Sequence, residues 1–198
     1  MDKKVKNVYQ FKITLKESNP PIWRRIQVPE NYSFWDLHVA IQDAMGWYDC
    51  HLHEFRFKSP GENGKEVCIG IPFEDDYEKV QKGWNVKIIT IFNLVDETVY
   101  LYDFGDGWKH TVKLEKILPS EPGTKYPVCI DGERACPPED IGGIGGYYLL
   151  LEILSNTKHP QHKDMKEWLG RKLYPDSFNC IDVKFDDPKK RLKLAGLV

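Results

Sequence analysis

Apolar and polar residues alternate near the start of the chain in the pattern of a half-buried β-strand. Every odd position from 9 to 15 is apolar, and every even position between them is polar. Because successive side chains of a strand point to opposite faces, this segment is predicted to be a strand with one buried face. Residues 17–21 interrupt the alternation and residues 22–28 resume it, which predicts a β-hairpin with a medium-length loop.

Arg24 lies at an apolar position of the second predicted strand. A buried guanidinium would need a carboxylate partner. Alternatively, the aliphatic stem is buried and the charged head reaches water. We favour the second arrangement.

A helix is predicted over residues 34–45, where apolar residues recur at three- and four-residue spacing. Ser33 and Asp36 have the spacing of a capping box, and Gly46 is typical of a helix C-terminus. His38 flanks the apolar face and is interpreted as a packing or surface residue.

Further strands are predicted downstream. Residues 53–58 alternate as a third strand, and residues 66–73 are interpreted as a short edge strand. Residues 86–95 are apolar and fit either a buried strand or a single helical turn capped by Thr90.

A hairpin is predicted over residues 98–117, around an acidic turn with glycines. If residues 105–107 form a three-residue loop, Tyr102 pairs with His110, and Asp103 lies on the opposite face from His110. A one-residue bulge would bring Asp103 and His110 to the same face.

The second part of the chain is predicted to form a helical lobe. Residues 119–127 are rich in proline and turn residues and separate a core of about residues 5–118 from a C-terminal lobe of about 128–198. Within a single domain, the lobe is predicted to contain two helices (147–154 and 160–169), a last strand (178–185) and a short basic helix capped by Asp187.

The predicted elements together indicate an α+β fold, a mixed sheet with a packed helix and a helical C-terminal lobe. The order of hairpin, helix and strand also resembles a β-grasp core, and this likeness concerns the fold alone.

The composition excludes several classes of protein. The 198 residues are 41% hydrophobic and 13% aromatic, which argues against disorder. The 28 basic and 30 acidic residues give a net charge of -2, so no global field attracts nucleic acid or a membrane surface. The N-terminal segment has no secretory pattern, and no stretch approaches the roughly 20 apolar residues of a spanning helix. Five scattered cysteines fit reduced thiols, so we expect a cytoplasmic protein without membrane association.

Five motifs occur in order along the chain: WRRI at 23–26, DLHVAIQDAMGW at 36–47, HLHEF at 51–55, YDFGDGWKH at 102–110 and ACPPEDIGGIGGY at 135–147. Together they resemble the plasmid pRiA4b ORF-3-like family. The resemblance implies a cytoplasmic prokaryotic α+β protein, carried on chromosomes or mobile elements, with largely uncharacterised activity. Some members carry a recombinase-like name, and members often have a cysteine where this chain has Ile141.

The acidic turn is the first candidate site. Asp103 and Asp106 with His110 offer carboxylate and imidazole groups that suit a divalent cation or acid/base chemistry. The structural alternative is that Asp103 pairs with Lys109, Asp106 accepts from turn amides, and His110 packs beside Tyr102.

Two further groups are candidate ligands. His51 and His53 would project to the same side of one strand and present two imidazoles to a metal, or they are buried with neighbouring aromatic residues. Glu139 and Asp140 precede a glycine-rich loop, where they would bind a cation or cap the following helix.

Cys129 and Cys136 are separated by six residues and lack the usual zinc-site spacing. With Arg24, these two cysteines are candidates for structural or partner contacts. Trp23 and Arg25 on the second strand and the basic residues at 189–193 offer a small surface for nucleic acid.

We favour a binding or accessory module without established catalysis. The alternatives are a metal-dependent hydrolase or nuclease using Asp103, Asp106 and His110, and a DNA-binding accessory of a mobile element. The sequence leaves the cofactor open, with a divalent metal as the candidate. The sequence leaves the oligomeric state open.

Overall fold

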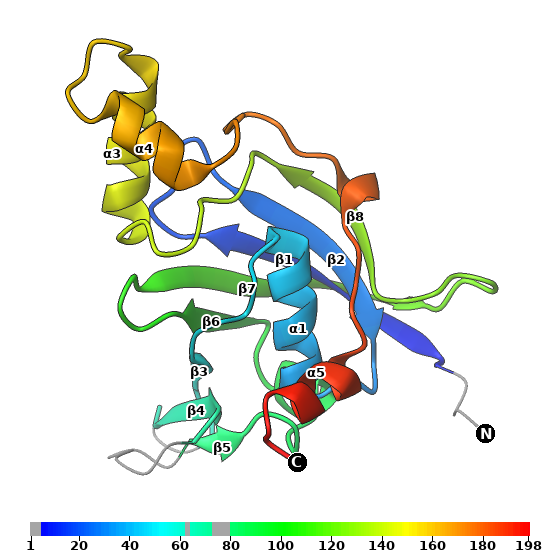
Figure 1. The fold of residues 1–198 in the computed structure, drawn as a ribbon. Coiled ribbons are helices and arrows are strands. Elements are labelled where there is room, and N and C mark those ends of the chain that lie inside the picture. The colour runs from blue at the N-terminus through cyan, green and yellow to red at the C-terminus, as the bar shows by residue number, and fades with distance from the viewer. Residues whose placement is uncertain (1–4, 62–63, 73–79) are drawn as a thin grey trace.

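A single sheet organises the chain (Figure 1). The computed structural model describes residues 5–61, 64–72 and 80–198. Within these residues the sheet has the strand order β5-β4-β3-β6-β7-β1-β2-β8 and is mixed, because β4 and β5 pair in parallel and the other neighbours are antiparallel. The strands are β1 (Asn7–Leu15), β2 (Trp23–Pro29), β3 (His53–Lys58), β4 (Glu66–Gly70), β5 (Gln81–Lys82), β6 (Glu97–Tyr102), β7 (Trp108–Pro119) and β8 (Val128–Glu133).

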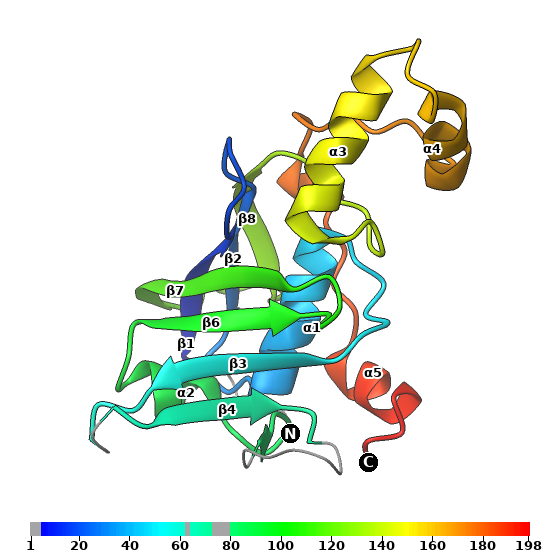
Figure 2. The same ribbon diagram turned by 90° about the vertical axis from the view of Figure 1, so that its left-hand side faces the viewer.

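Five α-helices accompany the described strands: α1 (Phe34–Met45), α2 (Ile88–Phe92), α3 (Gly143–Ser155), α4 (His162–Leu169) and α5 (Pro188–Leu194). In Figures 1 and 2, α1 covers one face of the sheet, and α3 and α4 lie together at one end of it. This arrangement confirms the α+β class.

The two elements with the clearest periodicity form as predicted. β1 and β2 are an antiparallel hairpin in which Phe11 pairs with Ile26. Helix α1 begins with the complete capping box of Ser33 and Asp36 and ends at Gly46, whose φ is 85°. These capping signals are local, so the sequence alone is enough to predict where the helix begins and ends.

Aromatic side chains fill the space between α1 and the sheet. The Phe34 ring of α1 packs against the rings of Phe55 on β3 (5.0 Å between centroids) and Phe92 on α2 (6.0 Å). Phe92 in turn contacts Phe11 on β1 at 4.6 Å. Large aromatic side chains dominate the burial of apolar area, so this cluster joins four elements of the chain in one core.

The predicted register of the central hairpin is wrong. Tyr102 pairs with Trp108, and His110 pairs with Tyr100. Asp103 has φ 54°, a left-handed conformation that aspartate tolerates better than most residues. The chain therefore leaves β6 two residues before the predicted point, and the amide of Gly107 donates to the carbonyl of Asp103 at 2.7 Å.

Other boundaries also differ from prediction. The apolar segment at 86–95 contains the single-turn helix α2, whose N-cap is Lys87 and not Thr90. Residues 128–133 were not predicted as a strand but pair with β2 as the edge strand β8. β4 is shorter than the predicted 66–73, of which residue 73 lies outside the described residues.

The helices of the lobe also deviate in their bounds. α3 starts at Gly143, four residues early, and α4 starts two residues after Pro160. The predicted strand at 178–185 contains a short 3-10 helix, Cys180–Asp182. Helix α5 is capped by Asp187 as predicted, and it packs near the start of α1, where the Trp35 indole donates to the Pro188 carbonyl at 2.8 Å.

Candidate functional site

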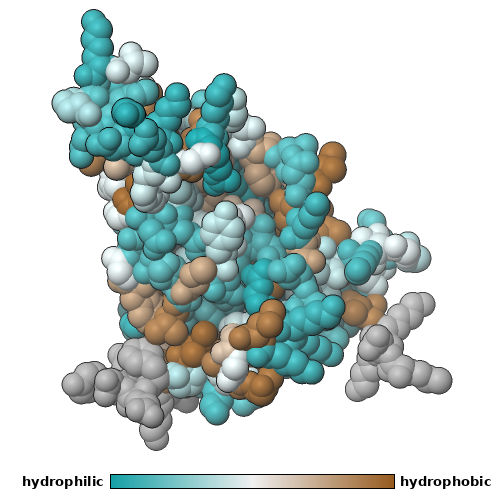
Figure 3. Space-filling model, in the orientation of Figure 1, coloured by the Kyte–Doolittle hydropathy of each residue, from teal (hydrophilic) through white to brown (hydrophobic). Residues whose placement is uncertain are grey.

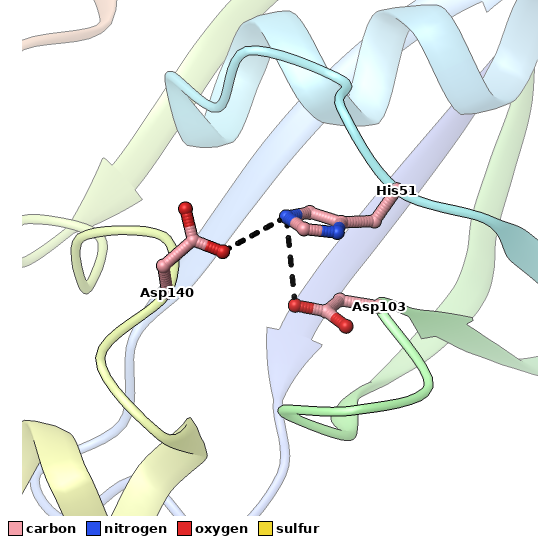
Figure 4. Close-up of side chains that lie close together, drawn as sticks. All are labelled: His51, Asp103 and Asp140. Atoms are coloured by element: carbon pink, nitrogen blue, oxygen red, sulfur yellow. Dashed lines mark ion pairs between the residues drawn. The ribbon is translucent and has the colours of Figure 1, made fainter.

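Three segments that are distant in sequence bring one imidazole and two carboxylates together (Figure 4). His51 lies between α1 and β3, Asp103 starts the turn after β6, and Asp140 lies in the loop before α3. The His51 Nε2 atom is 3.1 Å from Asp140 Oδ1 and 3.7 Å from Asp103 Oδ2. One ligand atom from each of the three residues lies within 4.8 Å of the others.

Asp103 is held by its own turn. Its Oδ1 atom accepts from the amides of Gly105 (2.9 Å) and Asp106 (3.3 Å), and its own amide donates to the Leu52 carbonyl at 2.9 Å. The other carboxylate oxygen, Oδ2, faces His51. The left-handed backbone of Asp103 therefore both ends the strand and directs a carboxylate to the imidazole.

The loop with Asp140 is docked on the same turn. The Asp106 carboxylate accepts from the Gly142 amide at 3.0 Å. Gly143 has φ 69°, and a Cβ atom there would lie 2.3 Å from the Asp106 carbonyl oxygen, so only glycine allows this close approach. Asp106 thus serves as a positioning residue for the loop, not as a member of the cluster.

Glu139 fastens the same loop to the core. Its carboxylate accepts from the Tyr102 hydroxyl at 2.5 Å and from the Tyr48 amide at 2.7 Å. Burial and the adjacent Glu139 carboxylate raise the pKa of Tyr102, so the tyrosine stays a neutral donor. The Trp47 indole donates to the Pro137 carbonyl at 2.9 Å.

The cluster is accessible from one side. The exposed fractions of the side chains are 11% for Asp103, 30% for His51 and 70% for Asp140. Asp140 therefore forms the open edge of the site, where a further ligand would approach.

Two of the predicted ligands lie elsewhere. His110 faces the core, in contact with the rings of Trp47 and Tyr100, and His53 is buried with its ring stacked on His38 at 3.4 Å. The predicted pairing of His51 with His53 fails because His51 precedes β3, where the two-residue periodicity of the strand does not apply. Asp103 and His110 do not group, because Asp103 lies in the turn after β6 and faces His51, whereas His110 is buried in the core.

The buried histidines predict a pH-dependent stability. Burial lowers the pKa of His110 to about 3, whereas the unfolded chain titrates near 6.5. Between these values the unfolded state binds more protons, so the free energy of unfolding falls as the pH falls, by up to about 1.4 kcal/mol per pH unit for one histidine. In His110→Leu, we expect the slope between about pH 5.5 and 4 to be shallower by up to this amount. Urea denaturation at several pH values measures it, and an unchanged slope would contradict the assignment.

Arg24 is buried, contrary to the prediction that its head reaches water. Its Nε atom donates to the Ala44 carbonyl at 2.9 Å, and its Nη1 atom donates to the carbonyls of Trp23 (2.8 Å) and Glu133 (3.0 Å). The acidic groups therefore gather around His51 and not around Arg24. Burial raises the pKa of Cys129 to about 11 and that of Cys136 to about 12, so both remain thiols.

A cleft of about 730 Å³ adjoins the cluster. We use this name for the space between the end of α1, the loop at 135–140, the end of α4 and the segment at 170–183. Asp140 belongs both to the lining of the cleft and to the cluster. Figure 3 shows that the face carrying α1 and α4 is mainly hydrophilic, with apolar residues in separate patches.

Both arginines considered for nucleic acid are engaged with acidic partners. Arg25 forms ion pairs with Glu115 and Asp131, both at 2.7 Å. Arg191 on α5 contacts the carboxylates of Asp43 (2.7 Å) and Asp49 (3.5 Å). This pairing reduces the positive charge that each arginine would offer to a phosphate backbone.

The family model described as plasmid pRiA4b ORF-3-like protein matches residues 7–182, which include the cluster and every residue of the cleft lining except Val183. The chain belongs to this family. The resemblance seen in the five sequence motifs is thereby confirmed.

Two relatives cover nearly the whole chain. The uncharacterized protein y4hQ of Sinorhizobium fredii (strain NBRC 101917 / NGR234) is 34% identical over 191 residues, which are 92% of this chain and 93% of that protein. The crystal structure of the protein of unknown function MM3350 from Methanosarcina mazei Go1 is 42% identical and superposes with a TM-score of 0.83 over 92% of this chain and 100% of that one. Because neither name states an activity, a function for this family member must be argued from its site.

The cluster was only partly visible in the sequence. His51, Asp103 and Asp140 each belong to the predicted candidates, but their grouping depends on three loops meeting. The contact of the Tyr48 amide and the cleft were not predicted, because neither a backbone amide nor a concave surface can be recognised from the order of residue types. In the part of the chain that the structure describes, every helix is too short or too polar to cross a membrane.

Proposed function

We propose that this family member binds a divalent cation through His51, Asp103 and Asp140 and acts as a cation-dependent binding module. The observation that carries the proposal is the convergence of these three ligand atoms within 4.8 Å from three separate segments. The His51 Nε2 atom is buried. Asp140 Oδ1 lies 3.1 Å away, but Nε2 makes no well-aligned hydrogen bond among the described residues, so its bonding capacity is not satisfied.

The donor set suits a first-row divalent metal. Imidazole binds Zn²⁺, Fe²⁺ and Ni²⁺ well, and carboxylates also accept Mn²⁺. The two carboxylates carry negative charge that would balance the positive charge of a bound cation. Three protein ligands leave at least one coordination position open, and the exposure of Asp140 gives a ligand access to it.

Binding is better supported than hydrolysis. The hydrolase alternative relied on Asp106 and His110, but Asp106 is bonded to Gly142 and His110 is sealed in the core. The DNA-binding alternative is weaker because Arg25 and Arg191 are engaged in ion pairs.

The test is cation binding by Asp103→Asn. Asparagine keeps the oxygen that accepts the turn amides and tolerates the left-handed backbone, so the fold is retained while one charged ligand is lost. By calorimetric titration of chelator-treated protein with Zn²⁺ and Mn²⁺, we expect at least about a 10-fold loss of affinity, since changes of even outer-shell partners cost 10- to 100-fold.

The matched control is Asp96→Asn, at an exposed position before β6. This variant should bind both metals as tightly as the wild type. The proposal fails if the wild type binds neither metal, or if the two variants lose affinity equally.

A further inference from the structure

Arg24 is a buried cation that lines the cleft. The exposed fraction of Arg24 is 1%. Among residues 5–61, 64–72 and 80–198, its hydrogen bonds go to the carbonyls of Ala44, Trp23 and Glu133, and no carboxylate pairs with it. Carbonyl groups carry no net charge, so the positive charge of the guanidinium is solvated but not neutralised.

One donor group of Arg24 is left over. A guanidinium has five N–H donors. The Nε and Nη1 atoms make the three bonds to carbonyls, whereas the Nη2 atom makes none within the described part of the chain. One face of the guanidinium is covered by the ring of Phe178, at 3.6 Å from the ring centroid. The Nη2 atom is therefore available to a further partner in the cleft that Arg24 lines.

The neighbouring groups do not supply a counter-charge. Cys136 lines the cleft, but burial raises the pKa of its thiol to about 12, so it is neutral. Of the carboxylates on the lining, Glu139 accepts from Tyr102 and Tyr48, and Asp140 faces His51. Asp182 is exposed on the outer segment.

The rest of the lining complements an organic anion. Arg171 and Lys172 add positive charge at the exposed border of the cleft, and Trp47 and Trp168 add aromatic surface. The volume of about 730 Å³ is within the range of small-molecule sites. Planar guanidinium groups recognise carboxylates and phosphates through two parallel N–H donors.

We propose that the cleft binds an organic anion, a carboxylate or a phosphate ester, whose oxygens contact Arg24 while its apolar part lies among the aromatic side chains. The cleft shares Asp140 with the cation cluster, but the proposed anion contacts Arg24 and does not require a bound cation. The binding experiment is therefore done on protein that a chelating resin has freed of metal, so failure of the cation proposal has no effect on the result. EDTA is left out of the buffer because it is itself a carboxylate that would compete for the cleft.

The test compares anions with a neutral molecule of the same shape. Benzoate and phenyl phosphate are titrated against benzamide, and binding is followed by NMR of the labelled Arg24 side chain. We expect at least one anion to bind about 10-fold or more tightly than benzamide, in line with the strength of charge-assisted hydrogen bonds. We also expect that anion to shift the Arg24 Nε–H signal.

Arg24→Gln should abolish the preference for the anion. Arg25→Gln is the matched control, because Arg25 adjoins Arg24 in sequence but pairs with Glu115 and Asp131 and does not line the cleft. It should retain the preference.

Three results would overturn the proposal: no binding of either anion at millimolar concentration, equal binding of anions and benzamide, or an unchanged preference in Arg24→Gln. Circular dichroism shows whether Arg24→Gln folds. If it does not, the NMR titration of the wild type tests whether the anion binds at Arg24. A bound anion that leaves the Arg24 signal unmoved then refutes the site.

Discussion

Gly146→Ala is expected to destabilise the folded protein by more than about 3 kcal/mol, a severe effect for one methyl group. Gly146 lies in the first turn of α3, where the helix passes close to the loop that precedes it. A Cβ atom at this position would lie 1.8 Å from the Ile141 carbonyl oxygen. The obstacle is backbone, so it cannot rotate away as a side chain would, and the loop with Asp140 must move. Urea denaturation followed by tryptophan fluorescence measures the loss.

Gly145→Ala is the matched control in the same helix. A Cβ atom there meets nothing within 4 Å. Alanine is a better helix former than glycine by up to about 1 kcal/mol, so this variant should be neutral or slightly more stable than the wild type. Similar losses of unfolding free energy in the two variants would show that the clash with the Ile141 carbonyl is not the cause of the destabilisation.

Trp47→Ala is expected to lower the free energy of unfolding by about 3–5 kcal/mol, as is usual when a buried large aromatic residue is truncated. The Trp47 ring contacts the rings of Tyr102 (5.1 Å between centroids), Trp108 (5.6 Å) and His110 (5.3 Å). Its indole also donates to the Pro137 carbonyl. Truncation therefore opens a cavity in the core and releases the loop that holds Asp140.

Tyr48→Ala is the control for Trp47→Ala, because it shows how the same segment responds to the truncation of an exposed side chain. The Tyr48 side chain is 80% exposed, and only its backbone amide bonds to Glu139. We expect a change within about 0.5 kcal/mol, as for most surface substitutions. Equal losses at the two positions, measured by the same urea titration, would contradict a core role for Trp47.

The sequence predicts the features of this fold that depend on local signals. The hairpin of β1 and β2 and the helix α1 follow from periodicity and capping, which lie within a few residues of each other. The register of β6 and β7 was not predictable in this way, because it depends on the backbone conformation of Asp103. The strand β8 was missed because its pairing with β2 is made across about 100 residues of chain.

The site illustrates the same limit. His51, Asp103 and Asp140 could be chosen by residue type, yet two competing histidines of the same type, His53 and His110, proved to be core residues. The three cluster residues differ from these two histidines in that they lie on three loops that meet, and tertiary packing determines that meeting. The burial of Arg24 likewise depends on carbonyls of its own strand, of α1 and of β8.

Asp103 and Asp140 both have left-handed backbones, with φ of 54° and 60°. Only aspartate, asparagine and glycine adopt this conformation readily, so geometry alone narrows each position to a few residues. Of these, aspartate alone brings a carboxylate. If the proposed cation site is correct, a family member that keeps both loops but does not bind a cation is expected to carry Asn or Gly at these two positions. Such a substitution would remove the carboxylates without changing the fold.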